Sequence, residues 1–567
     1  MDIELTRTQR DSVEYKSGDL LVKGVAGSGK SIVLLQRALR FNKKAIEAKE
    51  KKRILIITYA NSLVNYTQEL LNQANQNPSL IELWTIDKCC SNIYRKMNNR
   101  GYIKFISKAQ DRKQHVAEAL QRHLNRTVKK HRFHDMEPEF WADEFLWIKQ
   151  RDYVTAEDYI KSERIGRGGK IRMTREDKAI AYELFLCYKE IIQEKNEFDW
   201  EDCYNYIIKH ADSIPQDMRY DYVMVDEAQD LSFAQLKTAK LLARTSVTIA
   251  ADKAQKIYKT SFTWKELGID IRGRGSKSLE KSFRSTKQIV QLAESLLEVN
   301  RALQEDQSEY TDPIIPEREG TIPTIISCKN AADESDIVIK LIKQYEKDNI
   351  IGVLYRSYSE YTTIQRWLLS AGISYQEIRK GKEWSFSKPG AKLSTLHSSK
   401  GLEFDVVIIP LFIESVFPLI KVIEDADEEQ VVEIIAQERS LLYVGLTRAK
   451  YELYLTCSSS PSRFISDFNS EYYQLKSSAG KSMPKPQRTD ICKRTDLNSG
   501  NCINSQQKVE ISETHEGTTI ITHIKGETKP VPFVLDFNKY HVQKAFIGKS
   551  IGDEVCILSK IYVIDKI

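Results

Sequence analysis

The sequence predicts an α/β fold with parallel strands, and three segments indicate it. The apolar stretch DLLV (19–22) precedes the glycine-rich GVAGSGKS (24–31), and the residues that follow have the spacing of an amphipathic helix. The apolar stretch YVMV (222–225) runs directly into the acidic DEAQD (226–230), and VTIAA (247–251) is again followed by polar residues. Strand, polar loop and helix in this repeated order are typical of a parallel sheet covered by helices.

The chain of 567 residues is long enough for three or four domains. Hydrophobic residues make up 41% and charged residues 29%, an ordinary globular balance, and no apolar run reaches the roughly 20 residues that span a bilayer. The first residues lack the pattern of a secretory signal, and the nine cysteines include no CxxC pair. We therefore expect a cytoplasmic protein with no membrane segment and no zinc or iron–sulfur site.

The stretch GVAGSGKS satisfies the GxxxxGK[ST] pattern of a phosphate-binding loop. Because the loop lies between a strand and the start of a helix, its backbone amides would point at anionic oxygens. Lys30 would reach the terminal phosphates, and Ser31 would ligate Mg²⁺. The whole loop is expected to bind a nucleoside triphosphate, through Gly24, Val25, Ala26, Gly27, Ser28, Gly29, Lys30 and Ser31.

The acidic stretch DEAQD and three distant polar residues supply the groups that hydrolysis needs. Asp226 would complete the metal shell, and Glu227 would orient and deprotonate the attacking water. The alternative for acids after a strand is a helix N-cap, which the phosphate loop in the same chain makes less favourable. Gln255 is placed to sense the third phosphate, and Arg284 and Arg448 to neutralise its charge from a second lobe. Taken singly, each arginine is more typical of a surface salt-bridge partner.

Eleven short motifs follow one another between residues 5 and 457. In their order they resemble superfamily 1 helicases of the UvrD/Rep kind. The motifs are LTRTQR, GVAGSGKS, TYAN (58–61), TID (85–87), FDWED (198–202), DEAQD, ADKAQKIY, SFRS (282–285), LYRS (354–357), TLHSSKGLEF (395–404) and YVGLTRAK (443–450).

The resemblance implies two RecA-like P-loop domains with a helical insert in the first. The strand-rich pattern of the tail predicts in addition a small C-terminal α+β module. Residues 126–134 and 164–175 of the insert are rich in Lys and Arg, which is consistent with phosphate contacts or with a solvated basic face. The expected boundaries are 1–88 and 196–276 for the first core, 89–195 for the helical, basic insert, 277–460 for the second core, 461–507 for a flexible linker and 508–567 for the module.

The resemblance also implies which residues bind ATP and DNA. Gln9 would read adenine, Phe283 would stack near it, and Glu403 would approach the ribose. Arg284 and Arg448 would be arginine fingers from the facing core, with Gln255 on the third phosphate. For the aromatic residues among the expected DNA contacts, the alternative role is packing in the core. Single-stranded DNA would contact these aromatic and polar side chains: Tyr59, Asn61, Thr85, Tyr258, Trp264, Arg356, Thr395 and His397.

The implied activity is that of an ATP-dependent translocase or helicase on single-stranded DNA or a tailed duplex, in DNA repair or nucleoprotein clearance. Lys400 stands where the opposite-polarity branch usually has glutamine, which favours 3′ to 5′ movement. Long members of the family insert a large accessory domain where this chain has only residues 358–394. The sequence therefore leaves open whether this chain unwinds duplex DNA. The alternative is a helicase-like DNA-end sensor subunit of an anti-phage defence or nuclease complex, with little unwinding of its own.

The last 23 residues, AFIGKSIGDEVCILSKIYVIDKI, resemble the C-terminal domain of the Gre transcript-cleavage factors. The matching features are the GK turn, GDEV (552–555) and the closing YVIDKI (562–567). In those factors the domain touches RNA polymerase, so the resemblance implies a docking module for RNA polymerase or another protein. The alternative is an appendage that contributes only to stability.

Overall fold

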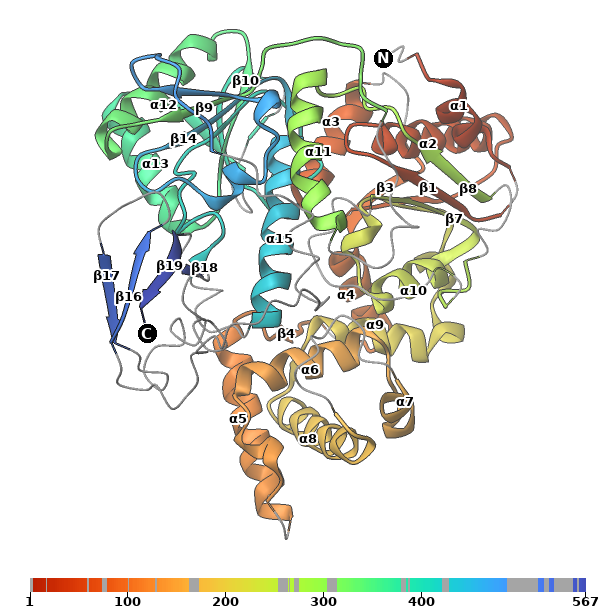
Figure 1. Cartoon of the computed structure of the whole chain (residues 1–567). Helices are drawn as coiled ribbons and strands as arrows, with labels where there is room; N and C mark the ends of the chain where they lie inside the picture. The colour runs from red at the N-terminus through yellow and green to blue at the C-terminus, as the bar shows by residue number, and fades with distance from the viewer. Residues whose placement is uncertain are drawn as a thin grey trace, which may run out of the picture. The chain divides into compact units, whose positions relative to one another are not determined.

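A computed structural model describes the chain as two compact units, Met1–Thr489 and Asp490–Ile567, which are treated separately below (Figure 1). The described residues are 4–486, apart from gaps at 17, 59–60, 74–78, 100, 128–129, 163–172, 253–263, 265, 270–274, 303–313, 379–383, 386–387 and 421–427, together with four strands between 519 and 566.

The first core is a six-stranded parallel sheet with the order β3-β2-β6-β7-β1-β8. Its strands are β1 (Leu20–Gly24), β2 (Ile54–Thr58), β3 (Ile81–Thr85), β6 (Tyr220–Val225), β7 (Ala243–Ala251) and β8 (Ser276–Leu279). Its helices are α1 (Arg7–Glu14), α2 (Lys30–Glu47), α3 (Asn61–Gln73), α4 (Ile86–Met97), α9 (Trp200–Lys209) and α10 (Phe233–Leu242), with one-turn helices η2 (Ala211–Ser213), η3 (Gln216–Met218) and η4 (Ala228–Asp230).

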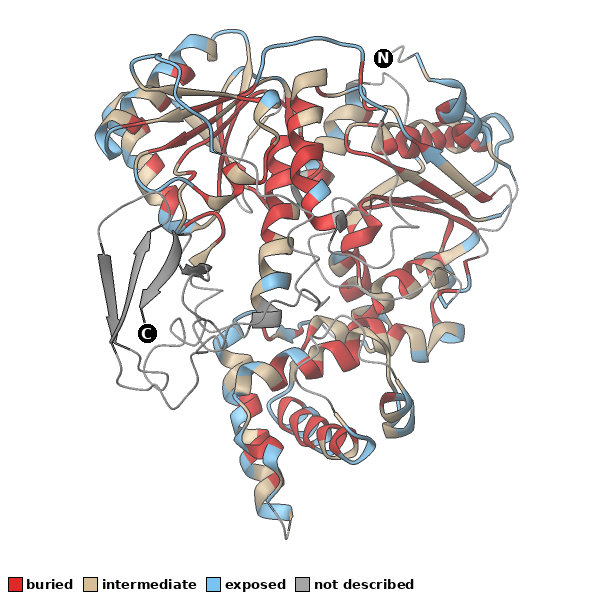
Figure 2. Ribbon diagram, in the orientation of Figure 1, coloured by how far each residue is buried: buried red, intermediate tan, exposed pale blue. Residues whose placement is uncertain are grey.

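Side-chain alternation along β2 explains why this sheet is covered on both faces. Ile54 and Ile56 pack with Leu35 of α2, whereas Leu55 and Ile57 pack in a second cluster with α4 and α10. All five residues of the strand are buried, as expected for a parallel strand between two helical layers. Buried residues run through the strands of the first core in Figure 2. The polar segments that follow β1, β6 and β7 therefore meet at one edge of the sheet.

The helical insert has its own core, in which the aromatic side chains Trp141, Phe145 and Tyr159 are fully buried. It consists of α5 (Ala109–Arg126), η1 (Arg132–Asp135), α6 (Pro138–Gln150), α7 (Ala156–Lys161) and α8 (Arg175–Glu194), with the short parallel pair β4 (Lys104–Phe105) and β5 (Glu197–Phe198) at its base. The boundary predicted at residue 89 falls inside α4 and is wrong, because Cys89, Cys90 and Ile93 pack in the core of the first domain.

The second core is a seven-stranded parallel sheet with the order β11-β12-β10-β13-β14-β9-β15. Its strands are β9 (Thr324–Ser327), β10 (Ile350–Tyr355), β11 (Tyr375–Glu377), β12 (Gly390–Thr395), β13 (Phe404–Ile409), β14 (Ala449–Cys457) and β15 (Gln474–Ser477). Its helices are α11 (Lys287–Ala302), α12 (Ala331–Tyr345), α13 (Tyr358–Ser370), α15 (Glu428–Leu446), η7 (Arg463–Ser466) and η8 (Ser470–Tyr472).

Both predicted limits of the second core need correction. Strand β8 pairs with β1, so residues 276–279 complete the first sheet and do not begin the second. Strand β15 pairs with β9, and Phe464, Ile465 and Phe468 are buried, so the chain beyond 460 adds to the second core where a linker was expected. The polar composition of this segment suggested a linker because an edge strand needs few apolar residues.

The C-terminal unit contains an antiparallel sheet with the order β17-β16-β19-β18. Its strands are β16 (Thr519–Ile524), β17 (Pro530–Val534), β18 (Glu554–Ile557) and β19 (Lys560–Lys566). The acidic end of GDEV therefore opens β18, and YVIDK lies in β19, whereas the expected helix and the GK turn are outside the described residues. Among the described helices of the chain, none combines the length and apolar character needed to cross a membrane.

Candidate nucleotide site

The phosphate loop follows β1 and has the backbone that its glycines permit. Gly27 and Gly29 have φ values of +72° and +82°, in the left-handed region that favours glycine. A Cβ atom on Gly27 would lie 2.7 Å from the Cβ of Arg284, so the loop also passes close to the SFRS segment. Ser28 Oγ is buried and has no hydrogen-bond partner among the described residues, a feature that a phosphate oxygen would satisfy.

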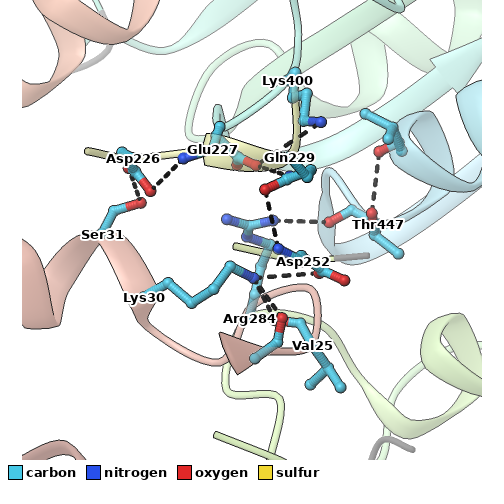
Figure 3. A network of polar contacts seen from close by, with 12 residues as sticks. Val25, Lys30, Ser31, Asp226, Glu227, Gln229, Asp252, Arg284, Lys400 and Thr447 are labelled. Carbon is cyan, nitrogen blue, oxygen red and sulfur yellow. Dashed lines mark hydrogen bonds and ion pairs between the residues drawn. The ribbon is translucent and has the colours of Figure 1, made fainter. Parts of the chain in front are cut away.

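The Lys30 ammonium lies inside the loop, where α2 begins. It donates hydrogen bonds to the carbonyl oxygens of Gly24 (2.8 Å) and Val25 (2.9 Å) and forms an ion pair with Asp252 Oδ2 at 3.2 Å (Figure 3). Asp252 immediately follows β7, at the same edge of the sheet. It is a site residue that the sequence analysis missed, although its position directly after an apolar strand was a usable signal.

Ser31 and Asp226 lie together at the predicted metal position. The Ser31 hydroxyl donates to Asp226 Oδ2 at 2.6 Å, and Asp226 Oδ1 accepts a hydrogen bond from the Glu227 amide. Burial, with the neighbouring Glu227 carboxylate, raises the pKa of Asp226 to about 6. Two hard oxygen donors in a buried acidic position fit Mg²⁺, which would stabilise the ionised carboxylate.

Glu227 adopts a left-handed backbone conformation, with φ of 51°, directly before the one-turn helix η4. Burial alone would raise the pKa of Glu227, but the nearby charges of Lys400, Lys30 and Arg448 lower it below the usual range. Gln229 Nε2 donates to Glu227 Oε2 at 2.5 Å, and Gln229 Oε1 accepts from the Asp252 amide. Hydrogen bonds through Gln229 thus connect Glu227 to Asp252, the ion-pair partner of Lys30.

A cation from the second core reaches the same acids. The Lys400 ammonium lies 2.5 Å from Asp230 Oδ2 and 3.8 Å from Glu227 Oε2. The sequence analysis used Lys400 only as an indicator of polarity, and it did not assign a role to Asp230. No local pattern marks this contact, because 170 residues of chain separate the two partners. Gln255, the predicted phosphate sensor, lies outside the described residues.

The two predicted arginine fingers lie near one another. Arg448 follows α15 in the second core and is 1% exposed, with its guanidinium bonded to the carbonyls of Val444 and Leu402 and to Thr447 Oγ1. Burial and the neighbouring Arg284 lower the pKa of Arg448 to about 9. The guanidinium lies close enough to Glu227 to contribute to the low pKa of that acid.

Arg284 lies at the junction of the two cores, because the next residue, Ser285, donates through its Oγ to the Ala449 carbonyl of the second core. It follows β8 of the first sheet, and the neighbouring Phe283 amide donates to the Gly27 carbonyl at 2.9 Å. Its guanidinium donates to Glu403 Oε1 at 2.8 Å and to the Thr447 carbonyl at 3.3 Å. Glu403, predicted to approach the ribose, is thus paired with Arg284, which holds the pKa of this half-buried acid low.

Gln9 contacts the phosphate loop directly. Its side-chain amide donates to the Ser28 carbonyl at 2.9 Å, and its Oε1 accepts from the Thr6 amide in a capping box at the start of α1. Phe283, expected to stack near adenine, is 46% exposed. The two residues expected around adenine are therefore one anchored amide, Gln9, and one accessible ring, Phe283.

Arg37 anchors α1, and the sequence analysis missed it. Its guanidinium donates to the carbonyls of Ser12 (3.1 Å) and Tyr15 (2.6 Å) near the end of α1 and to Thr248 Oγ1 (3.0 Å) on β7. Burial lowers the pKa of Arg37 to about 10. In a sequence, an arginine within an amphipathic helix is expected to be exposed to solvent. Only the fold shows that Arg37 is buried and holds α1, the helix that carries Gln9, in place.

The residues expected to contact DNA divide into two groups. Tyr59 and Tyr258 lie outside the described residues, and so does the side chain of Asn61, which begins α3. Thr85 is buried and caps α4, because its Oγ1 accepts from the Lys88 amide. Trp264 is partly buried against the core of the first domain, which is the packing alternative.

The second-core members of this set lie around the end of β12. Thr395 Oγ1 accepts from the Ser398 amide at 3.0 Å, and Arg356 forms a two-bond ion pair with Glu438 of α15, at 2.9 and 2.6 Å. Burial, with the charges of Arg356 and Lys400, lowers the pKa of His397 to about 4. His397 is therefore neutral at pH 7.

The basic stretch at 126–134 is largely neutralised by neighbouring acids. Arg126 pairs with Glu190 at 2.8 Å, Arg132 with Asp177 at 2.7 Å, and Lys130 with Asp135 at 2.5 Å. This arrangement favours the solvated-face alternative for that stretch. Most of the second basic stretch, 164–175, lies outside the described residues.

Comparison with known proteins matches both cores. The model of the UvrD/REP helicase N-terminal domain matches residues 5–262, and that of the UvrD-like helicase C-terminal domain matches 277–385 and 378–460. The chain belongs to the UvrD/Rep helicase family. The predicted α/β class with two RecA-like domains is thereby confirmed.

Curated relatives named as DNA helicases match parts of the chain. A probable DNA helicase of Mycoplasma pneumoniae is 25% identical over 47% of this chain and 51% of its own length. The ATP-dependent DNA helicase PcrA of Staphylococcus aureus is 27% identical over 30% of this chain and 24% of its own. A probable DNA helicase II homolog of Rickettsia conorii is 41% identical over 14% of this chain and 13% of its own. The chain thus spans about half the length of the first relative.

Proposed function

We propose that this UvrD/Rep-family chain is an ATP-driven translocase that moves 3′ to 5′ along single-stranded DNA. The observation that carries the proposal is that its nucleotide site is built from both cores. Lys30 and Glu227 come from the first sheet, and Lys400 and Arg448 come from loops of the second, in one buried polar network. A nucleotide bound in such a site would hold the two cores together, and its hydrolysis would release them.

The residues of the site divide the chemistry between them. Lys30 and the loop amides would bind the phosphates, while Ser31 and Asp226 would hold Mg²⁺, which supplies charge neutralisation for the leaving diphosphate. Glu227, ionised at pH 7, would orient the attacking water and accept its proton. Arg448, which is always cationic at this pH, would stabilise the charge on the transferred phosphate.

The strand-binding part of the proposal rests on the TLHSSKGLEF segment. Thr395 and His397, expected at the strand, stand three to five residues from Lys400, which contacts the acids of the nucleotide site. Family membership and the DNA helicase names of the relatives support DNA as the strand. A short rigid segment that spans both sites would let strand binding and hydrolysis influence each other.

Steady-state ATP turnover with and without single-stranded DNA tests the proposal. We expect stimulation by single strands, little stimulation by blunt duplex, and background turnover for Lys30→Ala. Absence of stimulation would overturn the motor function. Displacement of streptavidin from biotin at the 5′ but not the 3′ end of a single strand would support the 3′ to 5′ direction, and the reverse result would contradict it.

A further inference from the structure

One buried cation of the nucleotide site has no part in the hydrolysis described above. Lys400 is 4% exposed, and its ammonium pairs with Asp230 at 2.5 Å. It also approaches Glu227 to 3.8 Å (Figure 3). Lys400 belongs to the second core, whereas both acids follow β6 of the first. The ion pair therefore joins the two cores in a region from which water is excluded, where a missing partner is costly.

Asp230 and Glu227 belong to one rigid unit. Asp230 is the last residue of η4, Glu227 is its N-cap, and the Asp230 amide donates to the Glu227 carbonyl at 3.1 Å. Glu227 holds a left-handed φ of 51°, which costs free energy in a residue other than glycine and persists only where neighbouring contacts impose it. A cation that fixes Asp230 therefore also fixes the direction of the Glu227 carboxylate.

Lys400 is itself held by a tight turn. The Ser399 amide donates to the Thr395 carbonyl at 3.0 Å, and the Lys400 amide donates to the His397 carbonyl at 3.3 Å. The turn packs against the first core as well, since a Cβ atom on Gly401 would lie 2.1 Å from Leu63 Cδ2 of α3. The turn that carries Lys400 therefore has contacts to the first core through both Leu63 and Asp230.

We propose that Lys400 is a positioning residue that couples strand binding to hydrolysis: closure of the two cores on a strand seats its ammonium on Asp230, which aligns Glu227 with the attacking water. The inference rests on the proposed function, because it names the regulation of that same site. It differs from a simple stabilising ion pair in one respect. A stabilising pair would affect turnover equally with and without DNA, whereas a coupling pair acts mainly when DNA is bound.

The test compares ATP turnover of the full chain and its Lys400→Met variant over a range of ATP concentrations, with and without oligo(dT). We expect the stimulation of kcat by DNA to fall on the order of tenfold, as when the orientation of a catalytic group is lost, with KM for ATP within about twofold. Lys343→Met, on the exposed face of α12 in the same core, is the matched control and should behave as the native chain.

Asp230→Asn provides the second variant, and it should reproduce the loss in the DNA-stimulated rate. The double variant should be no worse than either single one, because both remove the same contact. Equal losses with and without DNA, a rise in KM alone, additive losses or unchanged stimulation would each overturn the inference. If the native chain shows no stimulation, the proposed function fails; if it is stimulated and Lys400→Met is stimulated equally, only the inference fails.

Discussion

Two acidic motifs of this chain, DEAQD and FDWED, are both buried and both paired with a lysine from a distant segment. In DEAQD the lysine is Lys400, which reaches Asp230 from the second core. In FDWED it is Lys149 of α6, which pairs with Asp199 at 2.7 Å and Asp202 at 2.8 Å. Seen only as buried ion pairs, the two motifs are alike.

Their surroundings differ. Asp199 also accepts from Arg112 of α5 at 3.0 Å and from the Tyr188 hydroxyl of α8 at 2.8 Å, so its contacts join three helices of the insert to the start of α9. DEAQD instead follows a central strand, faces the phosphate loop and includes a residue with left-handed backbone. Burial and ion pairing therefore do not mark a catalytic acid; its place at the carboxyl edge of the sheet does.

Glu227→Gln tests whether DEAQD is the catalytic motif of the two, and it should have the largest effect. We expect kcat for ATP to fall by roughly a hundredfold or more, because a general base contributes about 10² to 10⁴ to the rate. The thermal midpoint should change little, since glutamine keeps the shape and the contact with Gln229. Turnover with DNA near the native rate would show that Glu227 is not the base.

Lys149→Ala tests the opposite member of the pair. Removing a buried cation leaves the Asp199 and Asp202 carboxylates uncompensated, so the free energy of unfolding should fall by about 3–5 kcal/mol. Urea unfolding measures this loss. Turnover per folded molecule should remain native, and Lys161→Ala, which breaks an exposed pair with Glu157, should cost less than about 1 kcal/mol. A large loss in kcat would instead assign FDWED to catalysis.

Arg37→Lys is expected to affect nucleotide binding more than chemistry. Lysine cannot bond to Ser12, Tyr15 and Thr248 together, so α1 and Gln9 would be held less firmly. We expect KM for ATP to rise about threefold to tenfold with kcat within about twofold, a difference of roughly 1 kcal/mol in binding. An equal fall in kcat would show that α1 also positions reacting groups.

Glu201 should produce the smallest effect, visible in the pH dependence of stability. Burial, with the Asp199 charge, raises its pKa to about 7. A raised folded-state pKa contributes stability below the unfolded value, near pH 4.5, and this contribution is lost as pH rises through about 7. Because the side chain is partly accessible, Glu201→Gln should stabilise the chain by about 1 kcal/mol at pH 8 and change little at pH 4. A variant that is less stable at pH 8 would contradict this assignment.

Much of the nucleotide site could be predicted because its determinants are local. A phosphate loop needs glycine at left-handed positions and a lysine at the helix start, and Gly27, Gly29 and Lys30 show that spacing within a few residues. The strand-then-acid pattern likewise indicated Asp226. The domain limits were less predictable, because membership of β8 and β15 in their sheets depends on pairing with strands far away in the sequence.

The sequence by itself determined the family, the α/β class and the phosphate loop, since each follows from residue types at short spacing. Only the tertiary structure decided that Arg284 follows a strand of the first sheet, that Arg37 fastens α1, and that Lys400 lies on Asp230. The physical reason is that a buried cation is defined by the acid or carbonyl that compensates it, and that partner is brought close by the packing of whole domains.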